Sequence, residues 1–261
     1  MSNRPVFLIT NDDGIDSPGL MALTEALAKM GDTVVIAPAE ERSGFSQAIT
    51  IMKPFRVEQR AESSYAVYGT PADCVVYGLF HVLKGRRPDW VVSGINRGAN
   101  LGDDTLYSGT VGAAMEAAYN GFPALAVSLV TEGRQRGVYH YEAAASVVSQ
   151  LLAQAELKAL AKNRVLNVNV PNCPFEMLKG SKVTELSRRH YDRGLKVETR
   201  SDGMGFCSYG SGPVSHDGQP GNDAHAVDQD YVALSLLQPS MFDPLGNESL
   251  RNIWPSDPQL V

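Results

Sequence analysis

Two adjacent carboxylates, Asp12 and Asp13, follow a short apolar run at residues 6–9, with only Thr10 and Asn11 between. Side chains alternate between the faces of a strand, so the pair converges on one point only if the chain leaves strand geometry, which Gly14 makes easy. At about 4 Å and an effective dielectric constant near 20, two such charges repel by about 4 kcal/mol. A divalent cation would remove this repulsion. In the alternative interpretation, Asp12 caps the turn and Asp13 caps the following helix.

Two later loops add neutral oxygen ligands. Ser43 lies in PAEERSG at residues 38–44, and Asn96 lies in SGINRGAN at residues 93–100. Both loops follow predicted strands, whose carboxyl ends meet at one edge of a parallel sheet. Two carboxylates, a hydroxyl and an amide oxygen favour Mg²⁺ or Mn²⁺ over zinc. Taken singly, Ser43 and Asn96 are more typical of ordinary turns than of a metal site.

A third segment, Ser108-Gly109-Thr110, precedes a run of small residues that begins at Val111. Free backbone amides at a helix start, together with two hydroxyls, can hold a phosphate without net positive charge. An equally open interpretation is a Ser108 N-cap followed by close helix packing through Gly112.

The elements that must position these residues alternate between strand and helix patterns. Apolar, β-branched runs predict buried strands, at residues 6–9, 33–37, 65–68, 90–92, 124–129 and 165–170. Helical patterns with start and stop signals lie between them, at residues 20–30, 72–83, 111–119 and 141–161. This order predicts an α/β fold with a doubly wound, mostly parallel sheet.

The amino-acid composition and the pattern of predicted elements change near residue 172. Residues 201–222 are rich in Gly, Ser, Asp and Pro and predict loops or hairpin turns, and residues 231–237 predict a return strand. We therefore divide the chain into a catalytic core at 1–171 and a C-terminal extension at 172–261. The extension is expected to hold a hairpin, the return strand and an arm used in oligomer assembly.

Composition excludes several classes of partner. The 261 residues carry a formal net charge of −6, which argues against nucleic-acid polymers and anionic membranes. Three widely spaced cysteines predict neither a disulfide framework nor a thiolate zinc site. No stretch resembles a signal peptide or a membrane span. We expect a cytoplasmic protein.

Other enzyme signatures are missing or incomplete. The chain lacks the glycine-rich dinucleotide fingerprint, the P-loop and the G-x-S-x-G elbow. Gly14 stands where a covalent aspartyl phosphatase would need its second Asp, and the acid spacing does not match a calcium loop. Among the histidines only His225, beside Asp223, attracts attention. The basic run at residues 188–190 is typical of a solvated turn, with contact to a substrate base or a neighbouring subunit as the alternative.

Five segments together resemble the SurE family, the stationary-phase survival proteins. They are TNDDG, PAEERSG with the Ile-Thr at 49–50, YGTPADCV, SGINRGANLGDD and YSGTVGAAMEAA, in order across residues 6–130. A weaker likeness, NDAHAV at 222–227, extends to about residue 238. The sequence departs from the family at Asp230-Tyr231 and at 235–237, where the family has Gly-Tyr and Thr-Pro-Leu.

The resemblance implies a Rossmann-like core and a metal-dependent 5′-nucleotidase that releases phosphate from nucleoside 5′-monophosphates. Some members also accept 3′-nucleotides or short polyphosphate, and members assemble as homodimers or homotetramers. One Mg²⁺ or Mn²⁺ ion per subunit is implied, with these ligands: Asp12, Asp13, Ser43 and Asn96. The implied phosphate-binding residues are Asn96, Ser108, Gly109 and Thr110.

The mechanism that we expect is attack of an activated water on phosphorus. Asp12, Asp13 and Asn96 are the expected catalytic residues, and either carboxylate could accept the proton of the nucleophile. The alternative function is a nucleotide-binding sensor or assembly protein in which the same residues hold the ligand without turnover.

Overall fold

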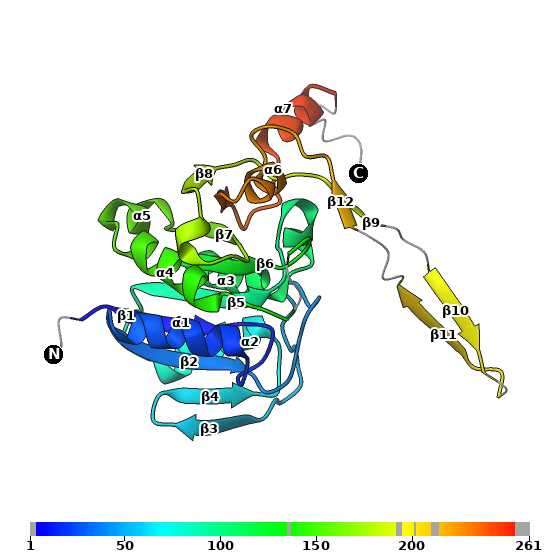
Figure 1. The fold of residues 1–261 in the computed structure, drawn as a ribbon. Helices are drawn as coiled ribbons and strands as arrows, with labels where there is room; N and C mark the ends of the chain where they lie inside the picture. The colour runs from blue at the N-terminus through cyan, green and yellow to red at the C-terminus, as the bar shows by residue number, and fades with distance from the viewer. Residues whose placement is uncertain (1–3, 135–136, 192–194, 201, 210–213, 254–261) are drawn as a thin grey trace.

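A computed structural model describes residues 4–134, 137–191, 195–200, 202–209 and 214–253. Its centre is a nine-stranded, mostly parallel sheet with helices on both faces (Figure 1). In order across the sheet, the strands are β3 (Val57–Ala61), β4 (Ser64–Val67), β2 (Asp32–Pro38), β1 (Val6–Thr10), β5 (Trp90–Arg97), β6 (Ala124–Val130), β7 (Val165–Pro171), β13 (Val232–Leu237) and β8 (Ser181–Val183). The predicted α/β fold class is confirmed.

Strand β1 connects the two halves of the hydrophobic core. Phe7 and Ile9 pack in one cluster with α1 (Pro18–Ala28) and α4 (Tyr141–Leu152). Val6 and Leu8 pack in a second cluster with α2 (Pro71–Tyr77) and α3 (Gly109–Tyr119). This division follows from the two-residue period of a strand, which sends neighbouring side chains to opposite faces. The central strand is therefore buried on both sides.

The predicted strands all occur, and β3 is an additional edge strand that the sequence analysis missed. The helix predicted over residues 141–161 is wrong, because the chain forms α4 and then a separate α5 (Ala155–Leu160). Gln154 between them has an extended backbone (φ −86°, ψ 111°). The turn at this residue allows Leu157 to pack against the same core as α4. Local helical periodicity does not reveal such a change of direction.

The C-terminal region contributes to the main sheet as well as to the periphery. Strand β13 pairs antiparallel with β7 and parallel with β8. The boundary at residues 171 and 172 stays a prediction, although two strands beyond it complete the core sheet. The remaining helical elements are the π-helical η1 (Gly78–Val82), the 3-10 helices η2 (Gly102–Leu106) and η3 (Phe175–Met177), α6 (Asp223–Asp228) and α7 (Pro244–Ile253).

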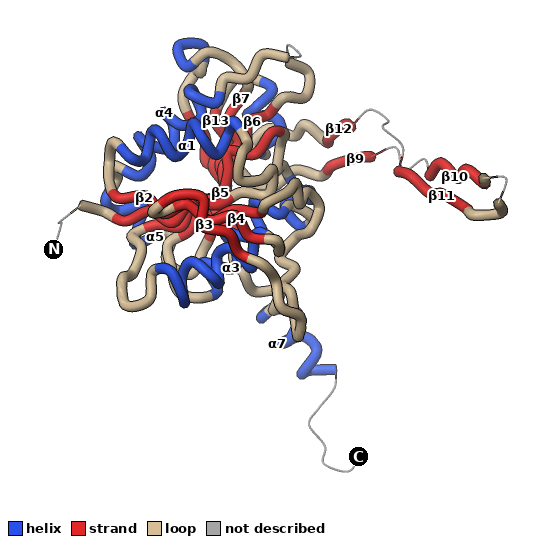
Figure 2. The backbone as a smooth tube through the Cα atoms, turned by 90° about the horizontal axis from the view of Figure 1, so that it is seen from below, coloured by secondary structure: helices blue, strands red, loops and turns tan. Residues whose placement is uncertain are grey.

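Two antiparallel strand pairs form an arm between β8 and α6. The pair of β9 (Arg189–Tyr191) with β12 (Val214–His216) lies nearer the body, and the pair of β10 (Leu195–Thr199) with β11 (Gly205–Tyr209) projects beyond it (Figures 1 and 2). The predicted hairpins in this region are therefore present. Residues 201 and 210–213 of the predicted loop-rich segment lie outside the described residues. Within the described part of the chain, none of the helices combines the length and the apolar character needed to span a bilayer.

Helix α1 approaches β5 so closely that only glycine fits at one position. A Cβ added to Gly19 would lie 2.0 Å from the backbone oxygen of Ile95, the residue before Asn96. Ser17 caps the helix by accepting from the backbone N–H of Leu20. This contact fixes the loop that carries the acid pair against the end of β5.

We expect Gly19→Ala to lower the free energy of unfolding by about 1–3 kcal/mol, the usual cost of overpacking. Helix propensity alone would predict a gain of about 1 kcal/mol. Urea unfolding followed by circular dichroism measures the difference. Met21→Ala, at an exposed position in the same turn, should change stability by less than about 0.5 kcal/mol. A Gly19→Ala protein as stable as its parent would contradict this packing argument.

Candidate active site

Asp12 is a buried carboxylate at the carboxyl end of β1, with 3 % of its surface exposed. Burial raises its pKa to about 6; hydrogen bonding from Thr110 lowers the pKa, and the charge of Asp13 raises it. Within the described part of the chain, no lysine, arginine or histidine side chain lies at ion-pair distance from Asp12. In this part of the chain the buried carboxylate is therefore stabilised by neutral hydrogen-bond donors such as Thr110.

Asp13 lies beside it and is only partly buried. Its Oδ2 accepts a hydrogen bond of 3.0 Å from the backbone N–H of Arg97, at the end of β5. Burial raises the pKa of Asp13, and the N–H and charge of Arg97 lower it. The bond connects the ends of β1 and β5.

The capping interpretation of the acid pair is wrong, because other residues perform both tasks. Asn11 holds the turn: its Nδ2 donates to the backbone oxygen of Gly14 at 2.9 Å, and its Oδ1 accepts from the backbone N–H of Gly14 at 3.3 Å. Ser17 caps α1. Neither carboxylate of the pair is needed for these roles.

Ser43 lies in the loop after β2, and Asn96 lies near the end of β5. Each is next in the chain to a residue whose backbone N–H bonds to the acid pair, Arg42 for Ser43 and Arg97 for Asn96. The N–H of Arg42 donates to the backbone oxygen of Asp12 at 2.7 Å. The Ser43 hydroxyl donates to Glu41 at 3.0 Å, and the Asn96 amide donates to the backbone oxygen of Gly98 at 3.0 Å. Among the described residues, neither side chain is hydrogen-bonded to Asp12 or Asp13. The structure brings the two loops to the acid pair with both side chains engaged elsewhere.

Helix α3 points its N-terminus at Asp12. Thr110 Oγ1 donates to Asp12 Oδ1 in a short hydrogen bond, and Ser108 Oγ accepts from the N–H of Val111 at 3.0 Å as the N-cap. A Cβ on Gly109 would lie 2.8 Å from Asp12 Oδ2. Gly112 also packs closely, since its Cβ would lie 2.1 Å from the backbone oxygen of Ser46. The interpretation as a capped, closely packed helix start is therefore confirmed, and the phosphate-binding role of this segment stays a prediction.

The donor set at this edge fits a hard divalent cation. Among the described residues Asp12 has no cationic partner and lies next to a second carboxylate. The loops that carry Ser43 and Asn96 are bonded to the pair through the backbone of Arg42 and Arg97. Among the described residues, no group of three or more His, Cys, Asp and Glu side chains could hold a metal ion. Two carboxylates with neutral oxygen ligands and water suit Mg²⁺ or Mn²⁺ and do not suit zinc.

A cavity of about 640 Å³ opens beside Asp13. Tyr139 and Tyr141 form part of its wall, and their rings stack with centroids 5.8 Å apart. Tyr139 is 40 % exposed, so one aromatic ring remains accessible. The other residues that line it are Asp13, Gly14, Ile15, Asp16, Ser17, Pro18, Ala39, Glu40, Glu41, Arg97 and Gly137. No motif at residues 138–141 marks either tyrosine as functional in the sequence.

The remaining candidates lie elsewhere. His225 contacts Gln229 on α6, with 3.0 Å between Nε2 and Nε2. The interpretation of residues 188–190 as a solvated turn is wrong for Arg189, whose side chain is 5 % exposed in an ion pair with Asp104. Asp223, noted only as a neighbour of His225, is fully buried and bonds to three backbone N–H groups.

An unpaired buried carboxylate lowers stability until a cation neutralises it. We therefore expect Asp12→Asn to raise the Tm of the protein in EDTA by about 3 °C or more. Excess Mn²⁺ should raise the Tm of the parent protein by mass action and leave Asp12→Asn unchanged. Differential scanning calorimetry measures both shifts, and Glu25→Gln, at an exposed carboxylate on α1, is the control. Equal melting in EDTA of Asp12→Asn and the parent would contradict this account of the buried charge.

Comparison with known proteins identifies relatives over nearly the whole chain. The family model described as "Survival protein SurE" matches residues 7–193. A protein named 5′-nucleotidase SurE from Vibrio cholerae is 42 % identical over 248 residues, which cover 94 % of this chain and 95 % of that protein. Another of the same name, from Actinobacillus succinogenes, is 43 % identical over 94 % of this chain and 96 % of its own length.

The fold has a close counterpart among solved structures. The crystal structure of the SurE protein from Aquifex aeolicus superposes with a TM-score of 0.81 and 34 % identity, covering 95 % of this chain and 99 % of the other. The family match spans the acid pair, the two loops and the start of α3. This chain belongs to the SurE family.

Proposed function

We propose that this protein is a metal-dependent 5′-nucleotidase that hydrolyses nucleoside 5′-monophosphates to nucleosides and phosphate. The observation that carries the proposal is the buried Asp12 carboxylate, which has no ion-pair partner among the described residues and accepts a hydrogen bond from Thr110 in the first turn of α3. The name 5′-nucleotidase SurE, borne by relatives over 94 % of the chain, supports the same activity. Hydrolysis of 3′-nucleotides and short polyphosphate is proposed as a secondary activity.

Asp12, Asp13, Ser43 and Asn96 would hold one Mg²⁺ or Mn²⁺ ion per subunit. When bound, such an ion polarises a phosphoryl oxygen and lowers the pKa of a water ligand. The protein contributes the fixed position of the acid pair. Thr110 orients the carboxylate of Asp12, and the N–H of Arg97 orients that of Asp13 at 3.0 Å.

The phosphoryl group is proposed to bind at the start of α3, between Asn96 and the segment Ser108–Gly109–Thr110. Backbone amides at a helix N-terminus donate to an anion and are already oriented before the substrate arrives. Each such donor is worth about 3 kcal/mol of barrier in comparable sites. Either Asp12 or Asp13 would accept the proton of the attacking water.

The nucleoside part of the substrate is proposed to enter the 640 Å³ cavity beside Asp13. The accessible ring of Tyr139 offers a stacking surface for a base, and such stacking is sequence-tolerant because every base has a π-face. Carboxylates of Asp16 and Glu40 line the same cavity and could accept hydrogen bonds from ribose hydroxyls. This arrangement favours nucleotides over phosphate esters of small alcohols.

Assembly and location complete the proposal. The arm and the exposed α7 support a homodimer or homotetramer built through C-terminal elements (Figure 2). Cys74, Cys173 and Cys207 are free thiols, which is compatible with the reducing cytoplasm.

Substitution of either acid tests the catalytic role directly. We expect Asp12→Asn and Asp13→Asn to lower phosphate release from AMP by about a thousandfold or more in excess Mn²⁺, because the ion loses a charged ligand. EDTA should abolish the activity of the parent, and Mn²⁺ should restore it. Glu25→Gln on the exposed face of α1 should retain full activity. Near-parental turnover by Asp12→Asn would reject this site, and a parent that binds AMP without releasing phosphate would favour the sensor function.

Removal of one aromatic ring tests the nucleoside cavity. We expect Tyr139→Ala to raise KM for AMP about tenfold, since loss of one stacking surface costs about 1–3 kcal/mol. Hydrolysis of p-nitrophenyl phosphate, which has no base or ribose, should change less than twofold. Tyr139→Phe keeps the ring and should behave like the parent. Equal losses for both substrates in Tyr139→Ala would place the nucleoside elsewhere.

A further inference from the structure

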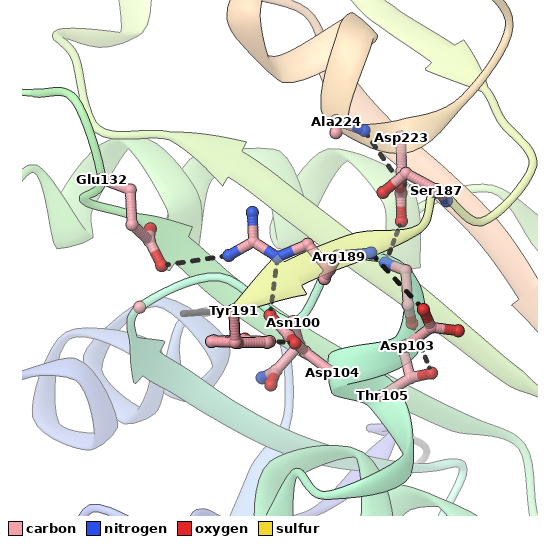
Figure 3. A network of polar contacts seen from close by, with 12 residues as sticks. Asn100, Asp103, Asp104, Thr105, Glu132, Ser187, Arg189, Tyr191, Asp223 and Ala224 are labelled. Carbon is pink, nitrogen blue, oxygen red and sulfur yellow. Dashed lines mark hydrogen bonds and ion pairs between the residues drawn. The ribbon is translucent and has the colours of Figure 1, made fainter. Parts of the chain in front are cut away.

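The segment at residues 187–191, which we call the arm root, lies across η2, the turn that leads into α3 (Figure 3). A Cβ on Gly102 would lie 2.1 Å from the backbone oxygen of Ser187, so the two chains are in direct contact. The carboxylate of Asp223 joins them. It accepts from the N–H of Gly102 at 2.8 Å and from the N–H of Ser187 at 2.9 Å.

Arg189 links the arm root to η2 through an ion pair with Asp104. Its Nε donates to Asp104 Oδ2 at 2.9 Å, and a terminal nitrogen lies 3.7 Å from Glu132 Oε1. The side chains of Arg189 and Asp104 are only 5 % and 13 % exposed. An ion pair so poorly hydrated holds its partners much more firmly than a surface pair does.

Tyr191 also bonds to the carboxylate of Asp104. Its hydroxyl donates to Asp104 Oδ1 in a short hydrogen bond. Burial and this hydrogen bond raise the pKa of Tyr191 to about 12, so the hydroxyl keeps its proton at neutral pH. Both oxygens of the Asp104 carboxylate are therefore held by the arm root.

The backbone of Asp104 is hydrogen-bonded to the start of the proposed phosphate-binding segment. Its carbonyl oxygen accepts from the N–H of Tyr107 at 3.0 Å and from the N–H of Ser108, the N-cap of α3, at 3.1 Å. Only three residues separate Asp104 from Ser108. A displacement of Asp104 would thus move the start of α3, whose Thr110 contacts Asp12.

We propose that Arg189 is a positioning residue that holds the start of α3 in its phosphate-receiving geometry through the Arg189–Asp104 ion pair. This makes the strand pair β9–β12, at the base of the projecting arm, a part of the active-site structure. The inference rests on the proposed function only in taking Ser108–Thr110 as the phosphate site. It assigns no contact between Arg189 and the substrate.

The test compares two neighbouring arginines on the arm root. We expect Arg189→Met to weaken binding of inorganic phosphate to the Mn²⁺-loaded protein, and to lower kcat for AMP, each by about tenfold or more, because small misplacements of a binding group are costly. Isothermal titration calorimetry measures the first and phosphate release the second. Arg188→Met, at an exposed position, should change neither by more than about twofold. Mn²⁺ affinity and inhibition by adenosine should match the parent in both variants.

Arg189→Met leaves the buried carboxylate of Asp104 without its ion-pair partner, which can prevent folding. Two further variants keep the test decisive in that case. Arg189→Lys retains the charge and should show a smaller loss of phosphate affinity, about threefold. The double variant Arg189→Met/Asp104→Asn removes both charges and should show the full loss. A merely structural role would lower Tm while phosphate affinity and kcat at 25 °C stay within twofold of the parent, and this result would overturn the proposal. Failure of the proposed function would appear separately, as a parent protein that releases no phosphate from AMP.

Discussion

The candidate site depends on a buried carboxylate that has no cationic partner among the residues that the structure describes. Asp12 is held by Thr110 and by the N-terminus of α3, and Asp13 adds a second negative charge at its side. Close approach of these groups requires the absence of a side chain at Gly109, while Gly19 allows α1 to contact β5. The fold thus accepts an electrostatic cost at one point, and surrounding hydrophobic packing on both faces of β1 offsets it. A buried charge that lowers stability in this way is typical of functional sites.

Much of the fold, and the place of the acid pair within it, could be read from local patterns. Short β-branched runs gave the central strands, and the apolar run that ends in Asp12 and Asp13 pointed to the carboxyl edge of the sheet. The antiparallel pairing of β13 with β7 could not be read in this way, because the paired residues are 64 to 72 positions apart in the chain and leave no local signature. The break between α4 and α5 was hidden by alanines and leucines that suit one long helix equally well. The exact hydrogen-bonding of Ser43 and Asn96 also depends on loop geometry that no sequence pattern specifies.

The role of Arg189 shows why charge patterns mislead. A run of Arg-Arg-His between polar residues is typical of a solvated turn, and Arg188 does lie in solvent. The side chain of Arg189 is buried because β9 packs against η2. There it pairs with Asp104, 85 residues earlier in the chain, and lies near Glu132, 57 residues earlier and just after β6. Asp223 likewise connects two segments, because its carboxylate accepts hydrogen bonds from the backbone N–H groups of Gly102 and Ser187. Its position two residues before a histidine does not indicate this role.

The two outermost strands of the sheet have a consequence for how copies of the protein can meet. Strand β3 carries Glu58 and Arg60, and β8 spans only three residues with Lys182 at its centre. Short, charged borders discourage another chain from adding a strand and so prevent open-ended fibrous stacking. The assembly proposed for this protein would therefore use the projecting arm rather than the rims of the sheet, and contacts made through an arm can close into a finite particle.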